Sequence, residues 1–244
     1  QRSCKRGPTG IGSKFIFVLH GGGLTSKIDP DFNLAEKVSD KVVRWDNMNE
    51  NRWDDNNQKK DLYINLPPTL QTVKLKNSKK RNYCSIVYAE NTRYLHKFNP
   101  APELEQTTKF FDEITEFVKK LDPSIQSKVK FRVKLNLGYN CEKRFTRLFG
   151  EKNIDTRTFK NPLKKAILNS KLVVVTYPET AFSQAMYSNV PTILVIKKEQ
   201  WAFSKAASNT FDDLVKHKIA FEDFEEAKNH INRHWSKIDY WWWS

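Results

Sequence analysis

Residues 172–196 read LVVVTYPETAFSQAMYSNVPTILVI, and this stretch decides the fold. Two short apolar runs, Leu172 to Thr176 and Thr192 to Ile196, predict fully buried strands. Pro178 to Val190 lies between them and predicts a helix, because proline suits a first helical turn. A strand, a crossover helix and a second strand make the repeating unit of a parallel sheet.

The same alternation continues on both sides of this stretch. Further strands are predicted at Lys14 to His20 (a short buried strand), Lys41 to Trp45, Leu62 to Leu66, Tyr83 to Ala89 and Lys128 to Leu137. Further helices are predicted at Phe32 to Asp40, Glu103 to Leu121, Pro162 to Ser170, Phe203 to His217 and Phe224 to His234. This order predicts an α/β fold, a Rossmann-like doubly wound parallel sheet with ligands beyond the carboxyl ends of its strands.

A charged linker suggests a division into two domains. Asn77 to Arg81 reads NSKKR, which places residues 1–76 in one domain and residues 77–244 in another. The aromatic tail, Trp235 and Tyr240 to Trp243, carries too many aromatic rings to leave in water. We expect it to pack on another domain, another chain or a membrane interface.

Composition narrows the class of protein without choosing a function. The 244 residues are 39% hydrophobic, and 42 basic residues against 28 acidic ones give a formal charge of +14. Such a surface attracts nucleic acid, acidic lipid headgroups or phosphorylated substrates. The three cysteines are odd in number and widely spaced, which argues against a disulfide framework and favours a reducing, cytoplasmic setting.

The turn after Val175 is a candidate phosphate site. Thr176 and Glu179 have the spacing of a capping box, and the backbone amides of a helix start suit a phosphate. Thr180 and Gln184 lie one turn apart and share a helix face. The alternative is an ordinary capped helix in which Glu179 serves the cap.

His20 followed by Gly21, Gly22 and Gly23 is a second candidate. Glycines let the backbone approach a ligand closely, and a histidine at a strand end can act as base or acid. The alternative is a structural histidine beside a flexible turn. The stretch is not a Walker motif, because no Gly-Lys-Ser/Thr follows.

Lys128 to Asn136 predicts a strand with one cationic face. A row of basic side chains cannot be buried unpaired, so the strand lies at an edge or its end opens on a cleft, with Lys134 nearest the carboxyl end. A solvated face is the alternative. His230 and His234 are spaced as a helical metal pair, but no third ligand accompanies them and no metal site is predicted.

The motifs and their order resemble a known family. The chain resembles transferases from bacterial surface-carbohydrate (O-antigen and capsule) gene clusters, from about Lys14 to Ser244. The residues that carry the resemblance are the strand–His20–Gly21-Gly22-Gly23 run, Glu36 to Lys41 with Trp45, Val174 to Thr180, Asn189 to Ile193, Phe211 to Leu214 with Ile219, and the final tryptophans.

The resemblance implies a fold and a donor site. Similar enzymes are metal-independent glycosyltransferases of the GT-B type, without a cofactor, whose second domain holds a nucleotide-activated sugar. Tyr177 and Thr180 match the family pattern T-Y-x-S-T-x-x-x-E. Glu179 replaces its serine, Gln184 replaces its acid, and Lys134 stands where the family tends to have arginine.

Two functions follow as hypotheses. In the first, the chain transfers a sugar to a saccharide or lipid-linked acceptor, with Thr176 to Thr180 and Lys134 at the donor phosphates and His20 as base. Residues 1–76 are then the remainder of an acceptor-side domain. In the second, the chain is a degenerate or non-catalytic module that binds RNA or acidic lipid headgroups. Nucleic acid is disfavoured because no RNA-binding motif is present. We expect a cytoplasmic protein, whose basic surface also suits the inner membrane, and a piece of a longer enzyme or a degenerate copy.

Overall fold

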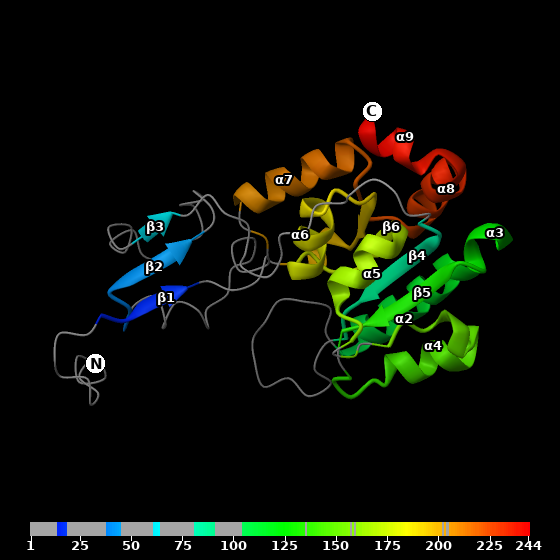
Figure 1. Ribbon diagram of the computed structural model, residues 1–244, viewed down its shortest axis with the longest axis horizontal. Helices are drawn as coiled ribbons and strands as arrows, with labels where there is room; N and C mark the ends of the chain where they lie inside the picture. Colours follow the sequence, from blue (N-terminus) through cyan, green and yellow to red (C-terminus); the bar gives the residue numbers. More distant parts are fainter. Residues whose placement is uncertain are drawn as a thin grey trace.

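The computed structural model in Figure 1 describes part of the 244-residue chain. The described residues are 14–18, 38–44, 61–63, 81–90, 104–134, 136–156, 158, 160–201, 203 and 205–244. They contain a three-stranded sheet and a five-stranded sheet, and every described strand pair in both sheets is parallel.

The three-stranded sheet has the order β1-β2-β3. Its strands are β1 (Ile16–Val18), β2 (Lys41–Arg44) and β3 (Asp61–Tyr63). The sequence predicts strands at all three places, but the prediction of a buried first strand is wrong, since Ile16 and Val18 are 49% and 46% exposed. β1 lies at the sheet edge, and apolar composition alone cannot distinguish an edge strand from a central one. The predicted helix at 32–40 falls mainly outside the described residues.

The five-stranded sheet has the order β5-β4-β6-β7-β8. Its strands are β4 (Tyr83–Tyr88), β5 (Val129–Val133), β6 (Ser170–Val175), β7 (Thr192–Val195) and β8 (Ala220–Phe221). The chain first adds β5 on one side of β4 and then adds β6, β7 and β8 on the other. The direction of winding therefore reverses between β4 and β6, as in doubly wound folds. This confirms the predicted Rossmann-like sheet.

Helices cover both faces of this sheet (Figure 1). They are α2 (Leu104–Lys119), α3 (Pro123–Gln126), α4 (Cys141–Phe149), α5 (Leu163–Asn169), α6 (Thr180–Tyr187), α7 (Lys205–Lys216), α8 (Phe224–His234) and α9 (Ile238–Trp243). Buried residues of α2, α4, α8 and α9 form one apolar cluster with one face of the strands. Those of α5, α6 and α7 form a second cluster on the other face.

Helix α2 shows why the sequence folds in this way. Its predicted apolar stripe is buried, because residues three and four apart share a helix face. The buried members are Phe110, Phe111, Ile114, Phe117 and Val118. Aromatic rings then link α2 and α4 to β5. Phe145 stacks on Phe131 with ring centroids 4.2 Å apart and lies 4.5 Å from Phe111.

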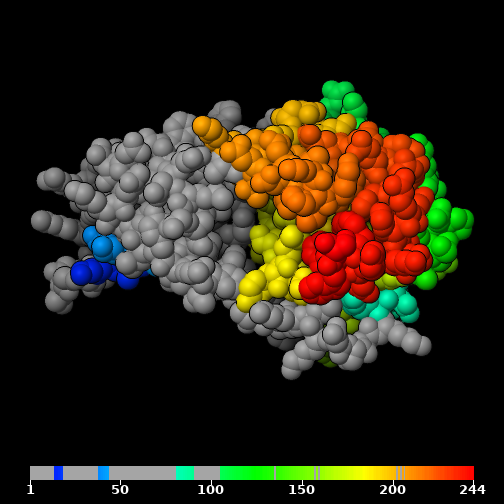
Figure 2. Space-filling view, turned by 90° about the horizontal axis from the view of Figure 1, so that it is seen from above, coloured from blue at the N-terminus to red at the C-terminus, as the bar shows by residue number. Residues whose placement is uncertain are grey.

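The aromatic tail is only partly buried. Trp235 is 7% exposed, and Trp242 Nε1 donates a hydrogen bond to Asn189 Oδ1 at 2.9 Å. In Figure 2, α9 (red) accordingly lies beside α8 and the yellow residues near α6. Tyr240 and Trp243 remain 77% and 64% exposed. The expected packing is thus observed for Trp235 and Trp242, whereas packing of Tyr240 and Trp243 on another chain or a membrane interface stays a prediction.

His230 on α8 makes the fold sensitive to acid. Its ring is half-buried, with its centroid 4.7 Å from Trp241 and 5.3 Å from Phe221. Burial, and then the neighbouring His234, lower the pKa of His230 from 6.5 to about 4. Between these values the unfolded chain binds a proton here and the folded chain does not. Stability is therefore complete above pH 6.5 and is lost as the pH falls toward 4.

We expect His230→Phe to reduce this acid sensitivity. The wild type should lose about 1–2 kcal/mol of its free energy of unfolding through this residue, after allowance for its partial exposure. Phenylalanine keeps the aromatic packing and cannot titrate. Urea unfolding of both proteins at neutral pH and near pH 5 measures the difference. An equal loss in the two proteins would show that His230 does not cause it.

Candidate functional site

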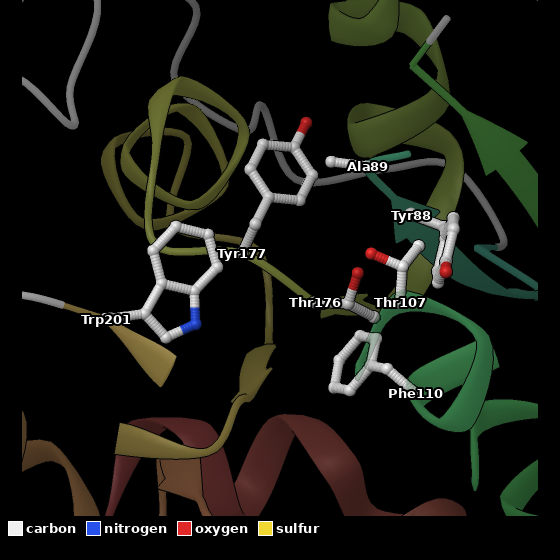
Figure 3. Close-up of a pocket in the computed structure, with 7 residues that line it drawn as sticks. All are labelled: Tyr88, Ala89, Thr107, Phe110, Thr176, Tyr177 and Trp201. Carbon is white, nitrogen blue, oxygen red and sulfur yellow. The ribbon is translucent and has the colours of Figure 1, made fainter. Parts of the chain in front are cut away.

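The five-stranded sheet reverses its winding between β4 and β6, and ligands of doubly wound folds bind at this point beyond the carboxyl ends of the strands. A small cavity lies there (Figure 3). It is lined by Tyr88, Ala89, Thr107, Phe110, Thr176, Tyr177 and Trp201. Its volume of about 20 Å³ suits one water-sized group. A nucleotide therefore cannot enter this cavity. The turn that joins β6 to α6 lies beside the cavity and contributes Thr176 and Tyr177 to its lining.

This turn does not form the predicted capping box. Thr176 is still attached to the sheet, because its backbone N–H and its Oγ1 both donate to the Val87 carbonyl, at 3.1 and 3.3 Å. The helix starts later, at Thr180, so Pro178 precedes it instead of lying in its first turn. Glu179 occupies the N-cap position, but its side chain makes no capping hydrogen bond to α6. The capping role that was the alternative for Glu179 is therefore not observed.

Lys134, Tyr177 and Glu179 come together at the edge of this turn. Lys134 Nζ lies 3.3 Å from Glu179 Oε2 and 5.5 Å from the centre of the Tyr177 ring. The Lys134 backbone N–H donates to the Tyr88 carbonyl at 2.9 Å, which fixes this residue just beyond the end of β5. We call these three residues the Lys134 cluster. The lysine and glutamate side chains are 46% and 27% exposed, so water screens their attraction and a stronger anion can compete for the lysine.

Of the other predicted site residues, two lie on α6 and three fall outside the described residues. Thr180 is the first residue of α6 and Gln184 lies one turn later, and both are half-buried. Ala181 and Ala185 of the same helix are buried against the sheet. His20, Gly21 and Gly22 lie outside the described residues, so their relation to this site stays a prediction.

Glu90 is a buried charge that the sequence reasoning missed. It follows β4, is 2% exposed, and accepts backbone N–H groups from Leu137, Tyr139 and Cys141 at 2.9, 2.5 and 3.1 Å. Its carboxylate thus binds amides at the start of α4. The sequence did contain a signal for Glu90, because this residue comes just after a buried strand, at the ligand-facing edge of the sheet. At this edge the first residue of α4 and the loop before it therefore bind an anion of the protein itself, whereas the N-cap residue of α6, Glu179, makes no side-chain cap.

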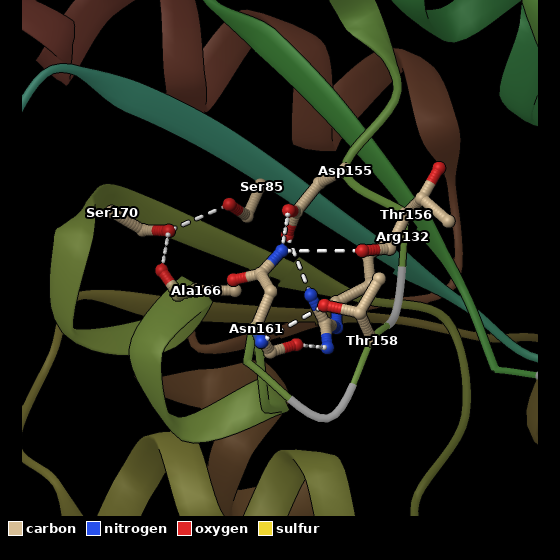
Figure 4. A network of polar contacts seen from close by, with 8 residues as sticks. All are labelled: Ser85, Arg132, Asp155, Thr156, Thr158, Asn161, Ala166 and Ser170. Atoms are coloured by element: carbon tan, nitrogen blue, oxygen red, sulfur yellow. Dashed lines mark hydrogen bonds and ion pairs between the residues drawn. The ribbon is translucent and has the colours of Figure 1, made fainter.

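The predicted cationic strand is only partly correct. β5 is an edge strand, as expected, but it ends at Val133 and not at Leu137. Arg132 is 2% exposed instead of solvated. It donates to Asp155 Oδ2 at 2.8 Å and to the Asn161 carbonyl at 2.7 Å (Figure 4). An alternating sequence pattern shows on which face of the strand a side chain lies. It does not show which later segment of the chain covers that face.

Three further properties of the described residues concern metal ligands, membrane spans and thiols. Within the described ranges, His, Cys, Asp and Glu side chains form no group of three or more that could hold a metal ion. Within the same ranges, every helix is too short or too polar to cross a membrane. Cys84 and Cys141 are free and buried, and burial raises the pKa of each thiol to about 12.

The sheet and the position of the site define a Rossmann-like domain similar to half of a GT-B glycosyltransferase, as the sequence predicted. The chain belongs to the LIC12162 family of transferases, whose family model matches residues 8–244. No curated protein matches the chain.

One solved structure of TarM shares the fold. A mutant of S. aureus TarM, in complex with fondaparinux, α-GlcNAc-glycerol and UDP, aligns with a TM-score of 0.52 and 14% identity, over 93% of this chain and 44% of that one. A second TarM structure aligns with a TM-score of 0.47 and 13% identity, over 96% of this chain and 45% of that one. The chain thus spans less than half the length of these neighbours.

Proposed function

We propose that this protein transfers a sugar from a nucleotide-activated donor during synthesis of a bacterial surface polysaccharide. One observation carries the proposal. In a chain of a transferase family, the Lys134 cluster and the start of α6 lie together at the edge of the sheet where the winding reverses. A cation beside a helix start suits a phosphorylated ligand.

Each residue has a role in the proposed transfer. Lys134 and the first amides of α6 offset the negative charge that develops on the leaving nucleotide, and no metal ion is required for this. Thr180 donates a hydrogen bond to a phosphate oxygen. Gln184, on the same face of α6, bonds a hydroxyl of the donor. His20 takes the proton of the acceptor hydroxyl.

The proposal also assigns the two parts of the chain. Residues 77–244 bind the donor, and residues 1–76 contribute to the acceptor side. Their separate parallel sheets support this division. The TarM mutant was solved in complex with UDP and α-GlcNAc-glycerol, which supports a nucleotide and a saccharide as ligands here. A saccharide or lipid-linked acceptor fits a protein that works in the cytoplasm at the inner membrane.

We expect Lys134→Ala to weaken donor binding by about 10- to 100-fold, because a charge-assisted hydrogen bond contributes about 1.5–3 kcal/mol. Calorimetric titration of UDP-, GDP-, CMP- and dTDP-linked sugars into both proteins measures the change. Lys143→Ala, at an exposed lysine of α4, is the matched control and should leave affinity within about twofold. If a donor binds and Lys134→Ala behaves like this control, the site is wrongly placed.

The opposite result is expected for Glu179. Glu179→Gln removes the carboxylate that pairs with Lys134 and would repel a phosphate, so affinity for the same donor should rise about tenfold. The double change Lys134→Ala with Glu179→Gln should lose this gain, because the two residues act on each other. Weaker binding by Glu179→Gln would instead make its carboxylate a direct contact of the donor.

A further inference from the structure

Two lysines lie over one indole at the amino-terminal edge of the five-stranded sheet, and Arg81 is close to one of them, Lys171. Lys171 Nζ lies 4.6 Å and Lys128 Nζ 5.9 Å from the centre of the Trp235 ring. Arg81, just before β4, pairs with Asp239 at 2.5 Å. We call these three cations and Trp235 the Trp235 cluster. Since β5 joins Lys128 to Lys134, the two clusters lie at opposite edges of the sheet, about 20 Å apart at the strand rise of about 3.3 Å per residue.

The local backbone directs Lys171 into this cluster. Tyr83 pairs with Ser170 and the next residue, Cys84, pairs with Leu172, so the register skips Lys171. A bulge of this kind changes the direction of a side chain and is common beside functional sites. The lysine therefore lies over the indole at an irregularity of the sheet.

The charges of the cluster are not balanced within it. Among the described residues, the cations of the Trp235 cluster form an ion pair with a single carboxylate, that of Asp239. The other terminal nitrogen of Arg81, Nη1, is buried there without a hydrogen-bond partner. Burial and the nearby charges of Lys128 and Arg81 lower the pKa of Lys171. Like charges held this close repel, and an anion at this edge would relieve the repulsion.

Exposed aromatic rings lie next to these cations. The Arg81–Asp239 pair attaches α9 to the cluster, and α9 carries Tyr240 and Trp243 at 77% and 64% exposure. Figure 2 shows the red atoms of α9 close to the teal atoms of β4. Basic residues beside exposed tyrosine and tryptophan are typical of surfaces that contact the headgroup region of anionic membranes.

We propose that the Trp235 cluster and the exposed rings of α9 form a docking surface for an anionic phospholipid bilayer. Lys128 and Lys171 contact lipid phosphates, while Tyr240 and Trp243 enter the interface. The surface gives the proposed transferase a defined side toward the membrane and leaves the edge with the donor site accessible. This inference rests on the proposed function in one respect, which is that the proposed transfer gives the protein a reason to bind a membrane.

Vesicle sedimentation tests this surface. The chain should bind vesicles of phosphatidylcholine mixed with phosphatidylglycerol, and not vesicles of phosphatidylcholine alone. Lys128→Gln with Lys171→Gln should weaken the partition by about 30-fold, since each lysine near an anionic surface contributes about 1 kcal/mol. Lys143→Gln with Lys165→Gln removes the same charge from exposed positions on α4 and α5 and should have little effect. Tyr240→Ser should weaken binding by a smaller factor and, at an exposed position, leave folding intact.

Three outcomes would overturn the inference. They are equal binding to both kinds of vesicle, an equal loss in the two double variants, or salt-sensitive RNA binding through Lys128 and Lys171 in a chain that ignores vesicles. Donor titration of the same double variant separates the two proposals. Unchanged donor affinity with lost vesicle binding supports both, whereas vesicle binding without donor affinity in the wild type contradicts the transferase proposal alone.

Discussion

Asp155→Ala is expected to lower the free energy of unfolding by about 3–5 kcal/mol, the effect of removing one partner from a buried ion pair. The guanidinium of Arg132 is 3% exposed and has Asp155 as its charged partner. Asn161 Nδ2 also donates to the other oxygen of Asp155 at 2.5 Å. Removal of the carboxylate therefore leaves a buried cation and loosens the segment that covers β5. Urea unfolding at neutral pH measures the loss.

Two further variants show whether burial is the cause. Glu116→Ala breaks the exposed pair with Lys119 on α2 and should leave stability nearly unchanged, because water screens this pair. Replacing both Arg132 and Asp155 with leucine should recover part of the loss, because no unpaired charge remains. A loss below about 1 kcal/mol for Asp155→Ala would mean that Arg132 reaches water without its partner.

Glu90→Ala is expected to destabilise the chain by about 2–4 kcal/mol, because three backbone amides lose their acceptor at once. The loop that these amides belong to follows Lys134, so donor affinity should fall as well, although Glu90 is buried away from the ligand. Hydrogen exchange should become faster at Leu137, Tyr139 and Cys141 and stay unchanged in α8.

Glu90→Gln separates charge from shape. It keeps one carbonyl oxygen and replaces the other with a donor that faces an amide, so most of the loss should remain. If both variants are as stable as the wild type, water replaces the carboxylate and Glu90 does not hold this loop. If stability falls and donor affinity does not, the loop has no part in the placement of Lys134.

Local patterns were sufficient for the elements around the site. The apolar runs of β6 and β7 and the stripe of α2 follow from periodicity, and the parallel order follows from the alternation of strands and helices. This was enough to place Tyr177 and Thr180 at the edge of the sheet. The alternating strand pattern also singled out Lys134, which the structure brings to Glu179 across 45 positions of the sequence.

The remaining features depend on contacts between distant segments. Thr176 has the spacing of a cap, yet its hydrogen bonds to Val87 keep it in the sheet. Arg132 alternates as a surface residue, yet Asp155 and Asn161 cover it. Spacing cannot show which partner a polar side chain finds when that partner lies tens of residues away.

A thermal-stability screen tests the central claim most directly. The chain is melted alone and with UDP-, GDP-, CMP- or dTDP-linked sugars, beside a single-stranded RNA control. The account predicts that at least one nucleotide sugar, at many times its dissociation constant, stabilises the fold by about 2–4 kcal/mol and does so less in Lys134→Ala. No response to any nucleotide sugar, together with stabilisation by RNA that disappears at high salt, would contradict it.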